Sequence, residues 1–83
     1  MGQEEKIKEA QEIIDWAIMY LNGSIKCKVM DYKHKNFRVQ FFSRENRPIM
    51  PTQINEEWIK QSNPKDNFIS DNLKMLLRNL ENY

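Results

Sequence analysis

The chain of 83 residues is long enough for one small domain, residues 1–83, and too short for two. Hydrophobic residues make up 40% of it and charged residues 30%, which is typical of a folded domain rather than a disordered segment. No apolar run approaches the roughly 18–20 residues that a membrane span needs, so we expect no membrane partner.

Residues 3–21 show the spacing of an amphipathic helix. The apolar residues that recur at three- and four-residue steps are Ile7, Ala10, Ile14, Ala17, Ile18 and Leu21. Asn22 and Gly23 predict the end of this helix, because both residues tolerate the left-handed conformation that closes many helices.

The same helix carries a second apolar group beside this stripe, made of Ile13, Trp16 and Tyr20. One interpretation is that another helix of the domain covers these side chains. The alternative is a protein interface, formed with a different partner or in a homodimer, since aromatic residues dominate such contacts. The sequence leaves both interpretations open.

Residues 25–32 and 37–44 alternate apolar and polar side chains and are rich in β-branched and aromatic residues, which predicts two strands. One face of the pair carries Ile25, Cys27, Val29, Phe37, Val39 and Phe41. The other face carries Lys26, Lys28, Met30 and Tyr32 together with Arg38, Gln40, Phe42 and Arg44. The connection has no glycine, so we expect a hairpin loop of about four or five residues, with Asn36 taking a positive φ.

The remaining segments predict an edge strand and two helices. A turn signal at residues 46–48 precedes residues 49–54, a candidate for a short third strand that two prolines place at the sheet edge. A short helix is predicted to begin after Asn55, its N-cap, and to run through Gln61. Ser70 is expected to cap the last helix. The apolar stripe of that helix contains Leu73, Leu76, Leu77 and Leu80.

Together these elements predict an α+β fold. It has an N-terminal helix, an antiparallel β-hairpin with a candidate short third strand at its edge, a short helix, and a C-terminal amphipathic helix packed on one sheet face. The helices or the third strand are needed because a two-stranded hairpin alone is marginally stable. With a single cysteine and no export signal, we expect a reducing, cytoplasmic setting.

The residue clusters of self-contained catalytic and metal sites are missing from the sequence. Cys27 and His34 are the only cysteine and histidine, which is too few ligands for a zinc site. Glu56 and Glu57 are adjacent on a predicted helix, so their carboxylates diverge. Two glycines in the whole chain exclude a glycine-rich phosphate loop. We therefore expect no enzyme, no cofactor and no bound metal.

The cations gather in the middle of the chain. Residues 24–47 hold seven cations and two acids, a net charge of +5, although the whole chain carries only +1. We expect the cations of the polar strand face to neutralise phosphates, Tyr32 and Phe42 to stack bases, and Gln40 to read base edges. The candidate residues for contact with nucleic acid or with an acidic protein surface are Lys26, Lys28, Tyr32, Lys33, Lys35, Arg38, Gln40, Phe42 and Arg44. As a further option, Lys33 and Lys35 at the hairpin tip could enter a duplex groove.

The sequence therefore predicts a small non-catalytic binding or regulatory module, with nucleic acid as one class of partner. The alternative is a protein–protein interaction module, an adaptor or inhibitor of the kind that a phage or mobile element encodes. It would use the same basic face or the patch around Trp16 and Tyr20. A third interpretation is that the cations only keep the sheet soluble, with residues 62–69 covering Tyr32 and Phe42.

Overall fold

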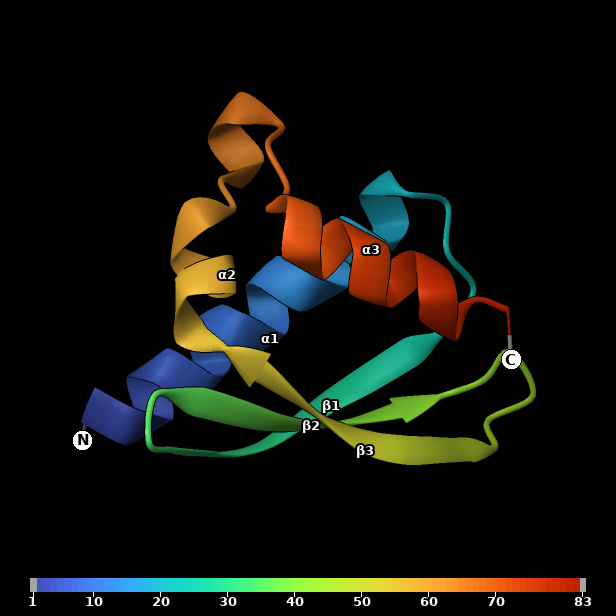
Figure 1. Ribbon diagram of the computed structural model, residues 1–83, viewed down its shortest axis with the longest axis horizontal. Helices are drawn as coiled ribbons and strands as arrows, with labels where there is room; N and C mark the ends of the chain where they lie inside the picture. Colours follow the sequence, from blue (N-terminus) through green and yellow to red (C-terminus); the bar gives the residue numbers. More distant parts are fainter. Residues whose placement is uncertain (1, 83) are drawn as a thin grey trace.

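In the computed structural model, which describes residues 2–82, a three-stranded antiparallel sheet forms one layer and the helices form a second layer on one of its faces (Figure 1). The elements are α1 (Gly2–Tyr20), β1 (Lys26–Lys33), β2 (Asn36–Phe42), β3 (Pro48–Asn55), α2 (Glu56–Gln61), the 3₁₀ turn η1 (Pro64–Asp66) and α3 (Asp71–Leu80). The strand order is β1-β2-β3. The predicted α+β fold is confirmed, and the candidate third strand forms and pairs with β2.

Helix α1 follows the predicted apolar stripe. Its buried side chains are Ala10, Ile13, Ile14, Ala17 and Ile18. The helix ends where expected, with Asn22 at a φ of 57° and the Gly23 N–H donating to the Ile18 carbonyl at 2.8 Å. A Cβ on Gly23 would lie 3.0 Å from Cγ2 of Ile18 and 3.2 Å from its carbonyl oxygen, so this close approach favours glycine.

The core lies between the helices and one face of the sheet, which we call the inner face. The sheet contributes Val29, Phe37, Val39, Phe41, Ile49 and Ile54, and the C-terminal half of the helical layer contributes Ile59, Ile69, Leu73, Leu77 and Leu80. Alternation along each strand brings these sheet residues to one side. Each large apolar side chain that is fully buried contributes about 1.5–3 kcal/mol, so this layer contact is the main source of stability.

The two C-terminal helices differ in how they begin. The carboxamide oxygen of Asn55 accepts the Glu57 N–H at 2.8 Å, which confirms the predicted N-cap of α2. Ser70 occupies the N-cap position of α3, as predicted, but its hydroxyl makes no capping hydrogen bond. Ser70 is buried where α2 and α3 meet, and its hydroxyl donates instead to Oε1 of Gln61 at 3.3 Å.

Strand β1 contains one residue more than its partner, and this bulge changes the faces of the residues that follow it. Val29 pairs with Val39, whereas Asp31 pairs with Arg38, which leaves Met30 as the extra residue. Because side chains alternate along a strand, the insertion reverses their order. Tyr32 therefore lies on the inner face, with its ring 4.8 Å from that of Phe37 between centroids, and its predicted place on the polar face is wrong.

The hairpin between β1 and β2 closes more tightly than the sequence predicts. Only His34 and Lys35 lie in the turn, at φ values of 52° and 64°, and Asn36 is already the first residue of β2. Positive φ at both turn residues matches the right-handed twist of the strands, although each non-glycine residue there costs about 1–2 kcal/mol. The predicted loop of four or five residues and the positive φ at Asn36 are therefore wrong.

Both edges of the sheet are protected from pairing with another chain. Along β1, the Gln11 carboxamide accepts the Val29 N–H at 2.8 Å and donates to the Cys27 carbonyl at 3.1 Å, as a neighbouring strand would. Two prolines, Pro48 and Pro51, lie in β3 and remove backbone donors from the other edge.

Replacing Gln11 with alanine should destabilise the protein by about 1–3 kcal/mol, because two backbone groups of β1 lose their partner. Urea unfolding followed by circular dichroism measures this loss. Glu12→Ala, at the exposed neighbouring position, is the matched control and should change the free energy of unfolding by less than about 0.5 kcal/mol. Equal effects of the two changes would contradict the proposed role of Gln11.

Candidate functional site

The second face of the sheet, which we call the outer face, carries no helix. Helices α1, α2 and α3 all lie on the inner side, and η1 contacts α1 on that same side (Figure 1). Within residues 2–82, no segment covers the outer face, so residues 62–69 do not shield it. The side chains that the pairing register places there include Lys26, Lys28, Arg38, Gln40 and Phe42.

The cations around the outer face form two groups at opposite ends of the sheet. The tip cluster consists of Lys33 and Lys35, on either side of the exposed His34. The loop cluster consists of Lys26, Arg44 and Arg47. Arg44 and Arg47 lie in the connection between β2 and β3. Lys26 is the first residue of β1, and its ammonium donates to the Asn46 carboxamide oxygen in that connection at 3.1 Å. All five cations are exposed to solvent, and Arg47 lies 3.8 Å from the Glu45 carboxylate.

Arg44 belongs to this end of the sheet and not to the outer face itself. Strand β2 ends at Phe42, so the alternation that predicted the orientation of Arg44 has already stopped. The guanidinium instead donates to the Ser24 hydroxyl at 3.3 Å. The predicted face of Arg44 is therefore wrong, although its side chain is exposed.

The centre of the outer face is less basic than its ends. Arg38 donates to the Asp31 carboxylate at 2.7 Å, because the bulge in β1 brings Asp31 opposite it. The two side chains are 57% and 47% exposed, so this pair contributes little to stability. It does cancel one positive charge, which leaves Lys28 as the free cation of the central rows within the described chain.

Gln40 has a structural use that the sequence does not reveal. Its NH₂ group donates to the Phe41 carbonyl at 2.9 Å and to the Ile49 carbonyl, at the point where the pairing of β2 with β3 shifts by one residue. Reading an adenine edge needs both the donor and the acceptor of a carboxamide. With the donors engaged, only the carbonyl oxygen of Gln40 is free for a partner.

Phe42 is the ring that stays on the outer face, opposite Lys26 on β1 and Pro48 on β3. Its neighbours leave it half-buried, so one ring face is the most that it can offer. The predicted pair of stacking rings is thus reduced to one.

Tyr32 takes part in a polar cluster that joins three elements. Its hydroxyl donates to Oε2 of the buried Glu56 at 2.8 Å and accepts from the Lys6 ammonium at 3.3 Å. The same ammonium lies 4.7 Å from the centre of the Tyr32 ring, and Lys60 is 3.8 Å from Oε2 of Glu56. This cluster ties α1 and α2 to β1 on the inner side.

The Tyr32 cluster also shifts the acidity of its members. The hydrogen bond from Tyr32, helped by the Lys60 and Lys6 ammonium groups, holds the pKa of Glu56 below its ordinary value of 4.5. The hydrogen bond with Tyr32 raises the pKa of Lys6 above its ordinary value of 10.5. Folding therefore favours the charged form of both groups.

The second apolar group on α1 divides between core and surface. Ile13 is 9% exposed and belongs to the core, so its predicted role in a protein interface is wrong. Trp16 is half-buried and packs against the core, whereas Tyr20 is 50% exposed, with the two ring centroids 5.4 Å apart. Helices α1 and α2 are in contact, so part of α1 is covered from within the domain.

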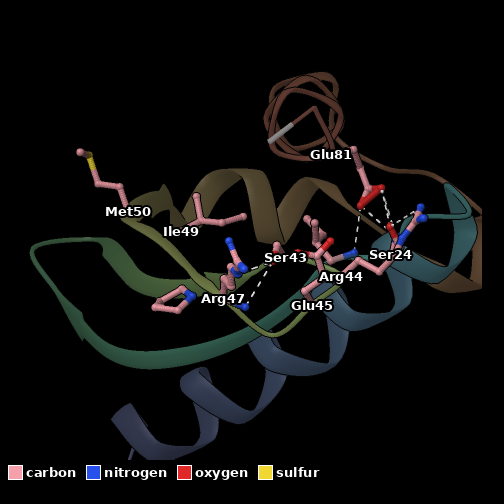
Figure 2. A pocket seen from close by; sticks show the side chains of 10 residues that line it. Ser24, Ser43, Arg44, Glu45, Arg47, Ile49, Met50 and Glu81 are labelled. Atoms are coloured by element: carbon pink, nitrogen blue, oxygen red, sulfur yellow. Dashed lines mark hydrogen bonds and ion pairs between the residues drawn. The ribbon is translucent and has the colours of Figure 1, made fainter.

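A pocket of about 580 Å³ lies at the loop end of the sheet (Figure 2). Its polar wall is built around Glu81, whose carboxylate accepts the Ser24 N–H at 2.8 Å and the Ile25 N–H at 2.9 Å. Figure 2 shows Arg44 reaching toward Ser24 and Glu81 from the opposite loop. Arg44 and Arg47 are balanced in the lining by Glu45 and Glu81, so the pocket itself favours neither anions nor cations.

Cys27 is not poised for nucleophilic chemistry. Burial, reinforced by the negative charge of Asp15, raises the pKa of its thiol to about 12. The thiol therefore stays protonated at neutral pH, and the thiolate is the reactive form. The described residues contain no group of three His, Cys, Asp or Glu side chains placed to hold a metal ion. None of the helices within residues 2–82 is long and apolar enough to cross a membrane.

Comparisons of the chain with protein-family models, with curated proteins and with solved structures find no match.

Changing Glu56 to glutamine should lower the melting temperature at pH 7, because the Lys6 and Lys60 ammonium groups lose their shared carboxylate. A carboxyl whose pKa is lowered by folding stabilises the protein above its ordinary pKa and loses this effect as the pH falls through the folded pKa. The difference in melting temperature between the parent protein and Glu56→Gln should therefore shrink below pH 4.5. Thermal unfolding across the acid range measures it.

Glu57→Gln is the matched control for this prediction, because Glu57 is the exposed neighbour on the same helix. The melting temperature of Glu57→Gln should differ little from that of the parent at every pH. If the melting temperature of Glu56→Gln stays equally far below the parent's down to the lowest pH, shape and packing, rather than charge, decide the role of Glu56.

Proposed function

We propose that this protein is a non-catalytic module that binds nucleic acid through the outer face of its sheet. The observation that carries the proposal is the uncovered sheet face, with exposed lysines along it and cation clusters at both of its ends. Such a surface complements a phosphate backbone, whose neutralisation by Lys and Arg releases counterions.

The distribution of charge over the two layers supports this proposal. Residues 24–47, which form β1, β2 and the loops around them, carry a net +5. Residues 1–22, which contain α1, hold two lysines and five acids, a net −3. The molecule is thus polarised despite its net charge of +1, and a field of this kind orients an approaching polyanion toward the sheet.

The chemistry of the face favours phosphate contacts over base reading. Tyr32 has turned inward, the donors of Gln40 are engaged within the sheet, and Phe42 alone offers a ring. A stacked base contributes about 1–3 kcal/mol, so one ring adds only a modest part of the affinity. We therefore expect binding with little dependence on nucleotide sequence and a strong dependence on salt.

The double change Lys26→Gln and Lys28→Gln should weaken oligonucleotide binding about tenfold or more at low salt and reduce the slope of log K against log[salt] by about 1.5–2. Fluorescence anisotropy of a labelled oligonucleotide measures both quantities. The control is Lys8→Gln with Lys65→Gln, which removes two exposed cations from the helical layer and should leave binding nearly unchanged. If no oligonucleotide binds the parent protein at low salt, the proposed function is wrong.

A second candidate function is protein–protein contact through the end of α1. The observation that favours it is the exposure of Tyr20 and its neighbour Met19, which are 50% and 77% exposed. Exposed aromatic and methionine side chains are enriched in protein interfaces. An acidic protein docked on the outer face is a variant of this candidate that uses the same cations.

Tyr20→Ala and Trp16→Ala separate the surface role of this patch from its structural role. Trp16→Ala should destabilise the protein by about 2–3 kcal/mol because Trp16 packs on the core, whereas Tyr20→Ala should cost less than about 1 kcal/mol. Chemical unfolding measures stability, and light scattering measures the mass in solution. A dimer that Tyr20→Ala converts to a monomer would support the second candidate, and a monomeric parent would argue against a homodimer through Tyr20.

A further inference from the structure

We infer that the nucleic acid bound by the outer face is a duplex, contacted by the tip cluster and the loop cluster on two sides of one groove. This inference rests on the proposed function and specifies its ligand. Three features carry it: the loss of a stacking ring, the distance between the two clusters, and the neutral pair between them.

A single strand is held mainly by the stacking of successive bases on aromatic side chains, combined with a basic groove. The bulge at Met30 sends Tyr32 to the inner face, where Phe37 and Glu56 engage it. Phe42 is then the one ring that the register leaves on the outer face of the described chain, and it is half-buried. The face therefore lacks the row of rings on which a single strand would stack.

The two clusters are too far apart to contact the same phosphate or two adjacent phosphates of one strand. Lys26 and Lys33 are the first and last residues of β1, and the bulge takes up one of the steps between them, so about 20 Å of strand separates them. The major groove of B-form DNA is about 12 Å wide, so clusters at this distance can reach the phosphate rows on both of its sides.

The density of phosphate charge also favours a duplex over a single strand. About 20 Å of duplex axis carries about 12 phosphate charges on its two strands, against about 6 on one strand at the same rise. A surface that gains affinity from phosphates and little from stacking therefore gains more from a duplex.

The centre of the face suits the floor of a groove. No phosphate would lie above the floor of a groove, so a net charge is not needed there. Arg38 and Asp31 neutralise each other at this position. The carbonyl oxygen of Gln40, the Lys28 ammonium and the exposed Gln53 carboxamide, on β3 opposite Arg38, are polar groups that lie between the clusters.

The test compares four labelled probes of one sequence: a DNA duplex of about 20 base pairs, the corresponding RNA duplex, and one single strand of each chemistry. Fluorescence anisotropy is recorded at several salt concentrations. We expect the DNA duplex to bind about tenfold tighter than either single strand and tighter than the RNA duplex, whose major groove is deep and narrow. Single strands that bind as tightly as the duplexes would overturn the inference and leave the proposed function standing. No binding of any probe would remove the proposed function as well.

Two double variants test whether both ends touch the same duplex. Lys33→Gln with Lys35→Gln alters the tip cluster, and Arg44→Gln with Arg47→Gln alters the loop cluster. Each should reduce the salt slope by about 1.5–2, and circular dichroism checks that each variant folds. The helical-layer double variant Lys8→Gln and Lys65→Gln should leave the slope unchanged. A slope that responds to only one of the two clusters would overturn contact across a groove.

Discussion

One inserted residue, Met30, determines which side chains of the hairpin reach solvent. It leaves the strands paired but reverses the alternation of β1 after Val29. As a result Tyr32 enters the inner layer and Asp31 emerges opposite Arg38. The core gains an aromatic contact and the inner side gains a partly buried hydrogen-bonded cluster, while the outer face loses a ring and gains a carboxylate. The chemistry of the proposed binding surface follows from this exchange.

Helix α1 holds the inner layer in place by polar contacts as well as apolar ones. The Gln11 carboxamide substitutes for a neighbouring strand along the edge of β1, and Lys6 reaches the cluster of Tyr32 and Glu56 near the hairpin tip. At the far end of the sheet, Glu81 after α3 closes the loop that leads into β1. Because these ties are made on the inner side and at the ends, the helices of the described residues leave the outer face uncovered.

The outer face therefore combines a hydrogen-bonded sheet with solvent-exposed cations. Lysine and arginine side chains keep their rotamer freedom until a partner orders them, which suits contacts to a repeating phosphate backbone better than contacts to one base. Two of the groups best able to read bases, the Tyr32 ring and the Gln40 donors, are committed to the fold. Under the proposed function, this division would place affinity for nucleic acid in the charges and leave little on the sheet for sequence recognition.

The sequence by itself determined the helices, the two strands of the hairpin, the Asn55 cap and the concentration of cations in residues 24–47, because periodicity, capping and charge are local properties. It left the third strand open, and the pairing of β3 with β2 settled it. Only the tertiary structure decided the bulge at Met30, the two-residue turn at His34 and Lys35, and the burial of Ile13. It also decided which groups of the candidate site are free. A bulge arises from how two strands align, and burial depends on which elements cover a residue. Both come from contacts between distant segments, and no local pattern records them.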